Sequence, residues 1–247
     1  MRTRKILVAL AAVFLVTGIA SADLKVVKKT HRDGFQIMGQ DNPPQDAEEV
    51  MWIGDNRLRV DRTDSSSIVR LDTKKLILVS HVDETYNVID LPLDLSAFLP
   101  EQMATQMKAM MTFDIEVTPA DERKKIGDWN ARRYDLKMVS KMVTIESALW
   151  ATPEIDVDLT AFHKMYQQII GLQPGMEGMA EEMLKVKGFV VAMDGVMIMN
   201  MMGGERVATT EKTVSAEQLD APASTYDPPA GYSKQDFDYM SVMQKRR

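Results

Sequence analysis

The chain contains no cysteine, and this absence excludes several kinds of chemistry. The protein has no thiol nucleophile, no disulfide, and no cysteine to which a lipid could be attached behind a signal sequence. Histidine is also scarce, because His31, His81 and His163 are the three in the chain and lie far apart in sequence. G-x-S-x-G, H-E-x-x-H and glycine-rich phosphate-loop motifs are absent as well. We therefore expect a protein that is not an enzyme and uses no cofactor.

The chain also has no excess of positively charged residues. The full chain has 30 Lys and Arg against 36 Asp and Glu, a formal net charge of −6. Without Arg2, Arg4 and Lys5, at the N-terminus, the net charge becomes −9. A chain this acidic has no electrostatic attraction to phosphate backbones. We expect no nucleic-acid partner.

Long apolar runs are absent except for one at the N-terminus. Basic residues at 2–5 precede an apolar run at 6–19 and the small residues of 20–22, Ala-Ser-Ala. This order predicts a secretory signal peptide, residues 1–22, cleaved after Ala22. An uncleaved anchor is the alternative, but the run is shorter than the roughly 20 residues that span a membrane. We expect a periplasmic or secreted mature protein that is soluble and has no transmembrane span.

Short alternating segments separated by turn residues fill the stretch 48–92. In 57–61, for example, Leu58 and Val60 alternate with charged residues. Alternation bounded by Gly, Asn, Asp and Ser predicts antiparallel strands joined by tight turns. Further strands are expected at 24–29, 113–117, 129–138, 143–150, 188–202 and 206–214.

The apolar period changes to that of a helix in three segments, 95–111, 158–170 and 176–185. Asp158 is a suitable N-cap for the second helix and Gly171 a suitable stop. Because hairpins dominate and no βαβ alternation is present, we predict an α+β, mainly β fold. It would be a curved antiparallel sheet, an unclosed half-barrel, whose concave side is covered by a lid of about three helices. One domain is expected over 23–235, with a disordered tail at 236–247.

Methionine is the compositional outlier, with 20 residues in the chain. Flexible thioether side chains fill irregular gaps in a core, and they also adapt to apolar ligands. Thioethers bind Cu(I) too, and Met197, Met199 and Met201 alternate so that they would share one face of a strand. Core packing, ligand lining and a copper site are the three interpretations of this pattern.

The predicted strands of residues 48–92, which we call the ladder, carry three arginines with two interpretations. They are Arg57, Arg59 and Arg70. On the concave face they would meet a carboxylate or a lipid head group. On the outer face they would pair with acidic neighbours such as Asp61 and Asp72. The orientation of the ladder decides between a pocket and an ordinary surface.

Several segments resemble a known group of proteins. These are M-W-I-G-D-N-R-L-R-V-D (51–61), I-V-R-L-D (68–72), T-Y-N-V-I-D-L-P (85–92), I-G-D-W-N-A-R-R-Y (126–134), L-W-A-T (149–152) and Y-D-P-P-A-G-Y (226–232). Together they resemble a family of uncharacterised bacterial envelope domains and, more widely, the LolA/LolB-like superfamily of lipoprotein carriers. The resemblance implies a half-barrel with a helical lid and an apolar cavity for acyl chains. Its motifs are structural, so no functional residue is transferred from those carriers.

We therefore expect a non-catalytic periplasmic protein that binds a hydrophobic ligand: a lipid, an acyl chain or a lipidated partner. The alternatives are a Met-based Cu(I) protein and an interaction module of the cell envelope. The ligand's identity and the oligomeric state stay open. The predicted lining of the cavity is Trp52, Phe98, Leu99, Met103, Met107, Met111, Phe162 and Tyr166.

Overall fold

The computed structural model describes residues 22–37, 40–92, 102, 112–172, 175–176, 178–200 and 204–238. Most of the predicted signal peptide, nearly all of the helix expected at 95–111 and the end of the tail from 239 on lie outside these residues.

Strands make up most of the described chain. In chain order they are β1 (Asp23–Arg32), β2 (Phe35–Ile37), β3 (Gln40–Asn42), β4 (Gln45–Ile53), β5 (Arg57–Asp61), β6 (Ser65–Arg70), β7 (Lys75–Ser80), β8 (Thr85–Asp90), β9 (Asp114–Ile126), β10 (Trp129–Val139), β11 (Val143–Thr152), β12 (Phe189–Met199), β13 (Glu205–Leu219) and β14 (Ser233–Gln235). Twelve of them form one sheet in the order β14-β8-β7-β6-β5-β4-β1-β13-β12-β11-β10-β9, while β2 and β3 pair separately. Pairing is antiparallel throughout, except between β14 and β8.

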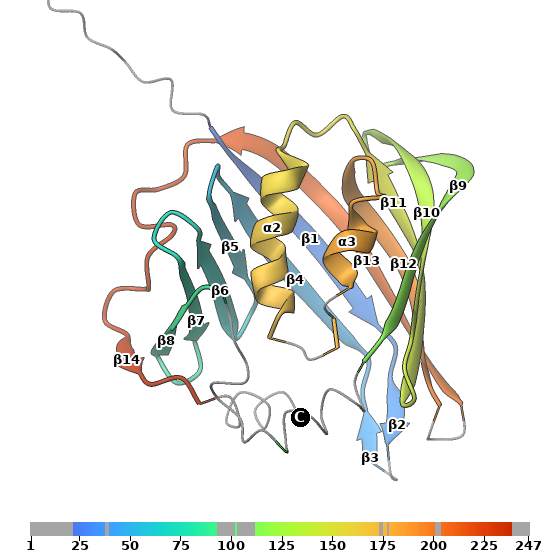
Figure 1. The fold of residues 1–247 in the computed structure, drawn as a ribbon, viewed down its shortest axis with the longest axis horizontal. Coiled ribbons are helices and arrows are strands. Elements are labelled where there is room, and N and C mark those ends of the chain that lie inside the picture. The colour runs from blue at the N-terminus through green and yellow to red at the C-terminus, as the bar shows by residue number, and fades with distance from the viewer. Residues whose placement is uncertain are drawn as a thin grey trace, which may run out of the picture.

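The first strand lies in the middle of the sheet. β1 pairs with β4 on one side and with β13 on the other, so it joins an N-terminal wing, β4–β8, to a later wing, β9–β13. The sheet is not closed, since it ends at β9 and β14. Figure 1 shows it curved around two helices, which lie on its concave side. We call this side the inner face and the opposite side the outer face.

The longer helix, α2 (Leu159–Ile170), begins and ends where the sequence predicts. The Asp158 carboxylate accepts hydrogen bonds from the backbone N–H groups of Thr160 and Ala161, at 2.9 and 3.0 Å, which satisfies two of the free donors of the first turn. Gly171 caps the C-terminal end. One face of α2 buries Met165 and Ile169 against the sheet.

The expected lid of about three helices, and with it the predicted fold class, is wrong. The described residues contain two helices, and α3 (Met179–Met183) has only five residues. Its N-cap, Gly178, makes no side-chain capping bond, and Glu182 ties this turn to the sheet by accepting a hydrogen bond from the Val117 backbone N–H at 2.7 Å. The fold is mainly β, as expected, and its main sheet has twelve strands and is not closed.

β4 and β9 are longer than the sequence predicts, and the additional residues are mostly polar. The first half of β4 and most of β9 are exposed, and their apolar pattern is weak. Both are held by regular antiparallel ladders to β1 and β10. Backbone hydrogen bonds to a neighbouring strand extend these elements, and hydrophobic alternation does not reveal such partners.

The core has a layer on each face of the N-terminal wing. On the inner face, Met51, Leu58 and Val69 pack with Met165 of α2. On the outer face, Ile68, Ile77 and Val79 pack with Tyr226, which belongs to the C-terminal segment (residues 220–238). The sheet of this wing is therefore buried on both sides. Among the described residues, no helix is both long and apolar enough to cross a membrane.

Candidate ligand cavity

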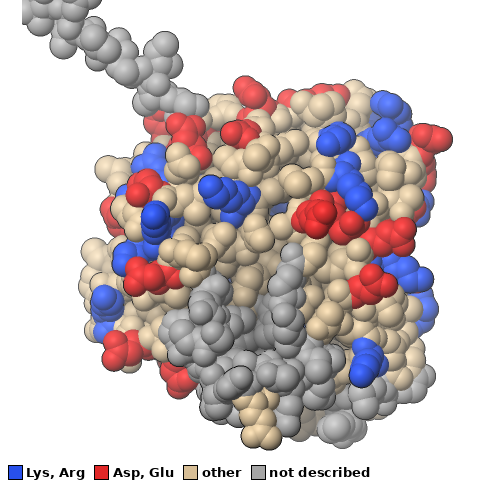
Figure 2. Space-filling model, viewed as in Figure 1, with Lys and Arg blue, Asp and Glu red and all other residues tan. Residues whose placement is uncertain are grey.

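A cavity of about 690 Å³ lies between the two helices and the inner face of the sheet. Its volume is within the range of about 300–1,000 Å³ that ligand pockets usually have. Figure 2 shows the helix-covered face of the molecule, on which acidic and basic side chains are interspersed and uncharged surface predominates. The described part of this face therefore carries no patch of one sign that would attract a charged macromolecule.

One end of the cavity is lined by apolar side chains. Met179 and Met183 of α3 pack in one cluster with Leu136 of β10, Leu149 of β11 and Met193 of β12, and all five line the cavity. We call this the apolar end. Thioether and leucine side chains adapt to irregular apolar shapes, so this end suits a flexible hydrocarbon chain.

Aromatic rings from α2 form another part of the wall. Phe162 stacks on Tyr166 with ring centroids 5.6 Å apart, and its ring centroid lies 5.5 Å from that of Phe189 on β12. All three rings line the cavity. The i, i+4 spacing of Phe162 and Tyr166 places them on one side of α2, which is why both reach the same space.

A partly buried ion pair lies in the wall beside these rings. Lys28 of β1 donates from Nζ to Oε1 of Glu211 on β13 at 2.7 Å, and the two side chains are 11% and 23% exposed. The Lys28 ammonium also lies 5.5 Å from the centroid of the Phe189 ring. Both charged residues line the cavity.

A β-bulge brings Glu211 to this position. Along the β1–β13 ladder Val27 pairs with Ser215 and Lys28 with Thr213, so Val214 is an extra residue without its own partner. The extra residue reverses the alternation of β13 and turns Thr213 and Glu211 to the inner face. Thr213 is buried, and its Oγ1 atom has no hydrogen-bond partner among the described residues.

Electrostatics keep the ion pair charged. Burial alone lowers the pKa of Lys28, but the attraction of Glu211, with smaller contributions from Tyr166 and Glu49, raises that pKa above its ordinary value. Burial raises the pKa of Tyr166, to which Glu49 adds, so its hydroxyl stays protonated and able to donate. A second ion pair, between Arg62 Nη2 and Glu49 Oε2 at 2.6 Å, balances the charge of Glu49.

His163, one turn before Tyr166 on α2, contributes a polar atom without a partner. Its Nδ1 atom is buried and makes no hydrogen bond within the described part of the chain. Burial lowers the pKa of this imidazole, so the ring is neutral near pH 7. His163 lines the cavity too. We call Lys28, Glu211, Tyr166 and His163 the polar end of the cavity.

The predicted lining residues have three different outcomes. Phe162 and Tyr166 lie in the cavity wall. Trp52 was misplaced: it packs on the outer face with Ile68 and Tyr226, because Met51 on the same strand points inward and successive strand residues alternate. The other predicted lining residues, Phe98, Leu99, Met103, Met107 and Met111, lie outside the described residues.

Two of the three methionines proposed for copper, Met197 and Met199, lie on β12. Met197 and Met199 alternate with Met193, so they share its inner face, and Met201 lies outside the described residues. The described residues hold no group of three or more His, Cys, Asp or Glu side chains arranged for a metal ion. The copper site stays a prediction.

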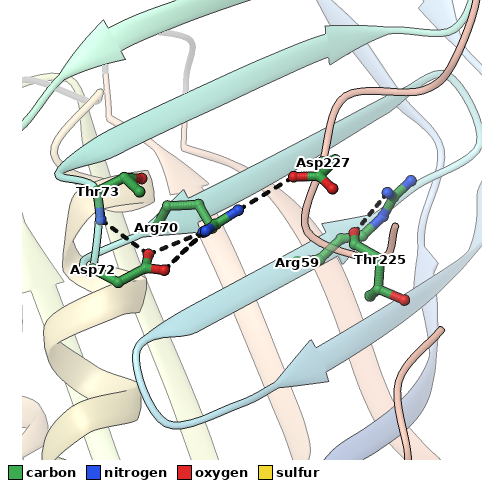
Figure 3. A network of polar contacts seen from close by, with 6 residues as sticks. All are labelled: Arg59, Arg70, Asp72, Thr73, Thr225 and Asp227. Carbon is green, nitrogen blue, oxygen red and sulfur yellow. Dashed lines mark hydrogen bonds and ion pairs between the residues drawn. The ribbon is translucent and has the colours of Figure 1, made fainter. Parts of the chain in front are cut away.

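The ladder arginines lie on the outer face. Figure 3 shows Arg70 between Asp72 and Asp227, and Arg59 reaching the C-terminal segment. Arg70 donates to Asp72 at 2.9 Å and to Asp227 at 3.2 Å, and Arg59 donates to the Thr225 carbonyl at 2.9 Å. Arg57 lies over the Tyr226 ring, 4.6 Å from its centroid. These arginines hold the C-terminal segment against the sheet.

A serine–histidine contact lies under the same segment. Ser66 Oγ is 2.7 Å from His81 Nε2 and also bonds to Asp61, while His81 Nδ1 is 3.1 Å from the Tyr232 hydroxyl. Ser66 is only 1% exposed. A hydroxyl buried in this way and shared with a carboxylate is placed to fix the C-terminal segment rather than to meet a substrate.

Sequence reasoning missed Lys28, Glu211 and His163 as parts of the cavity. A signal for Lys28 was present, because it continues the inward positions of Leu24 and Val26 on β1, where a charge is unusual. Glu211 had no such signal, since the bulge at Val214 changes the alternation of β13.

Comparisons with known proteins add little to this geometry. No protein-family model and no curated protein matches the chain. Solved structures do match, among them the structure of PNGF-II in the C2 space group, with a TM-score of 0.41 and 9% sequence identity over 91% of this chain. The chain spans 32% of the length of that protein. Such a distant likeness carries no functional inference and does not indicate the carrier superfamily that the sequence resembles.

Proposed function

We propose that this protein is a non-catalytic binding protein for a hydrophobic ligand. The ligand is a lipid, an acyl chain, or the lipid group of a lipidated partner. The observation that carries the proposal is the cavity of about 690 Å³ between the helices and the inner face. Its methionine- and leucine-lined end offers apolar surface that a hydrocarbon chain would bury.

The energetics of such binding follow from apolar area. Each buried methylene group contributes about 0.8 kcal/mol, so two additional methylenes strengthen binding about tenfold until the chain fills the space. The methionines Met179, Met183 and Met193 have several rotatable bonds, which lets the wall follow chains of different length.

The non-catalytic part of the proposal is supported by where the reactive groups lie. Lys28 and Glu211 neutralise one another in the cavity wall. The contact of Ser66 with His81 lies on the outer face, under the C-terminal segment. A ligand in the cavity would therefore be held by burial and hydrogen bonds rather than be converted.

The compartment is part of the same proposal. The basic start, apolar run and Ala-Ser-Ala of residues 2–22 favour export to the periplasm or beyond. The absence of cysteine fits a protein that folds there by burial alone.

The direct test is native mass spectrometry of the protein purified from cells without detergent, followed by solvent extraction of what it carries. We expect a bound lipid or acyl compound. After delipidation, added chains should rebind with affinity that rises with chain length. A protein that emerges empty and also ignores added chains and hydrophobic fluorophores contradicts the proposal.

The copper and interaction-module alternatives gain no specific observation from the cavity. Loss of Cu(I) uptake on replacing Met197 and Met199 with Leu would favour the first. Capture of a partner from an envelope extract, with no lipid bound, would favour the second.

A further inference from the structure

We infer that the cavity selects amphiphiles whose head group is uncharged and both donates and accepts hydrogen bonds, such as a monoacylglycerol. This inference rests on the proposed function and names the ligand class. The head group binds at the polar end, beside Lys28, Glu211 and His163, and the chain extends to the apolar end.

The two ends follow from the arrangement of the elements. Lys28 and Glu211 come from neighbouring strands near the centre of the sheet, β1 and β13. The Lys28 ammonium lies over the ring of Phe189, which contacts Phe162 of α2, so the ion pair lies beside α2. The methionines Met179 and Met183 come from α3 and pack with residues of β10 and β11. α2 contacts β5 and β6, and α3 contacts β9, so the two helices lie toward different wings of the sheet (Figure 1). One elongated ligand can therefore contact both ends.

The charge balance favours an uncharged head group. Among the described residues at the polar end, Lys28 pairs with Glu211, and nearby Glu49 pairs with Arg62. The local charge is already neutral. A charged head group would add an uncompensated ion beside this partly buried pair, where no opposite charge among these residues remains to offset the cost of desolvating it.

The hydrogen-bonding capacity favours a head group with both a donor and an acceptor. The Lys28 ammonium has three N–H groups, and within the described part of the chain it donates one of them, to Glu211, so others can donate to a ligand oxygen. Glu211 uses Oε1 for that bond, which leaves Oε2 to accept from a ligand hydroxyl. His163 also lines the cavity, and its buried Nδ1, which has no partner among the described residues, offers a further hydrogen-bonding position. Glycerol hydroxyls and an ester carbonyl meet these requirements together.

The test compares ligands with one chain and different heads. A hydrophobic fluorophore bound to the delipidated full-length protein is displaced at about pH 8, where carboxylates are ionised, by monodecanoylglycerol, methyl decanoate, decanoate and decyltrimethylammonium. Methyl decanoate is uncharged but cannot donate a hydrogen bond. We expect monodecanoylglycerol to bind about tenfold more tightly than each of the other three, which is the effect of one or two well-placed hydrogen bonds.

Variants assign the preference to the polar end. The double variant Lys28→Met/Glu211→Gln removes both charges together, and His163→Phe removes Nδ1 without touching the ion pair. We expect the head-group preference to fall to about twofold in the double variant and to weaken in the single variant, while the fluorophore still binds. The matched control is Lys75→Met/Asp90→Asn, which removes an exposed ion pair between β7 and β8 and should keep the full preference.

Equal affinities for the four heads in the unmodified protein, or tighter binding of either charged head, would overturn the inference while leaving the proposed function intact. Failure of the fluorophore and all four chains to bind would overturn the proposed function, and this inference with it. A preference that survives unchanged in the double variant would contradict the assignment to Lys28 and Glu211.

Discussion

Lys28 and Glu211 are 183 positions apart in the chain, yet their side chains form an ion pair of 2.7 Å in the wall of the cavity. The pair joins the first strand to β13 at the centre of the sheet. It is both a structural link between the two wings and an ion pair in the wall of the cavity.

Removing one partner of this pair should lower the free energy of unfolding more than removing both. In Glu211→Gln the Lys28 ammonium keeps its charge in a buried site, so we expect the free energy of unfolding to fall by about 2–4 kcal/mol. Lys28→Met/Glu211→Gln leaves no buried charge and should lose less. Urea denaturation of Glu211→Gln, Lys28→Met and the double variant measures the free energy of unfolding of each. A double variant that loses the sum of the two single effects would show that the charges do not interact.

His163 should make stability depend on pH. Burial lowers its pKa in the folded protein, so the unfolded chain takes up a proton at higher pH than the folded one does. The stabilisation is present above the ordinary pKa of about 6.5 and is lost as the pH falls through the lowered value. Relative to His163→Phe, the unmodified protein should therefore lose stability between about pH 8 and pH 5.

His31 provides a control of opposite sign. A hydrogen bond to Asp46 raises the pKa of this exposed histidine, so its contribution to stability grows as the pH falls through the raised pKa and is complete below the ordinary value. Relative to His31→Gln, the unmodified protein should gain stability over the same range. Identical pH profiles for the two comparisons would contradict both assignments.

The C-terminal segment should depend on one buried hydrogen bond. The Tyr226 hydroxyl donates to Asp23 Oδ2 at 2.9 Å, and Asp23 is only 7% exposed. Tyr226→Phe leaves that carboxylate without this donor, which should cost about 1–3 kcal/mol in chemical denaturation. Tyr86→Phe, on the same outer face but without a described hydrogen bond, should stay within about 0.5 kcal/mol. Equal effects of the two variants would mean that the bond contributes nothing.

Gly188 should tolerate no side chain. It has a φ of +129°, and a Cβ atom placed there would lie 2.5 Å from the backbone carbon and oxygen of Thr152. We expect Gly188→Ala to lower the free energy of unfolding by about 2–4 kcal/mol, through strain and this clash. Gly204 also has a positive φ, of +78°, but open space around it, so Gly204→Ala should cost about 1 kcal/mol. A thermal-unfolding series that ranks Gly204→Ala as the more damaging change would contradict this account.

Local signals predicted the local elements well. The N-cap at Asp158 and the stop at Gly171 locate α2, and the alternation of Leu58 and Val60 identifies β5. Such features depend on residues within one turn or one strand, so the sequence carries them directly.

Relationships between distant elements were predicted less well. Trp52 was assigned to the cavity because alternation defines two faces of a strand but does not tell which one the helices cover. Glu211 was missed because the extra residue Val214 reverses the alternation of β13. The outer cover over Ile68 and Ile77 comes from a C-terminal segment that lies more than a hundred residues further along the chain.

The most direct test of ligand binding in the cavity is a substitution that fills the cavity with a larger side chain. Ala180 of α3 lines the space, whereas its neighbour Glu181 is exposed and is not part of the lining. Binding of a hydrophobic fluorophore is measured for the unmodified protein, for Ala180→Phe and for Glu181→Phe, each checked for folding by circular dichroism. We predict that Ala180→Phe weakens binding at least tenfold and that Glu181→Phe binds like the unmodified protein. Equal binding by all three folded proteins would place the ligand elsewhere and contradict the account.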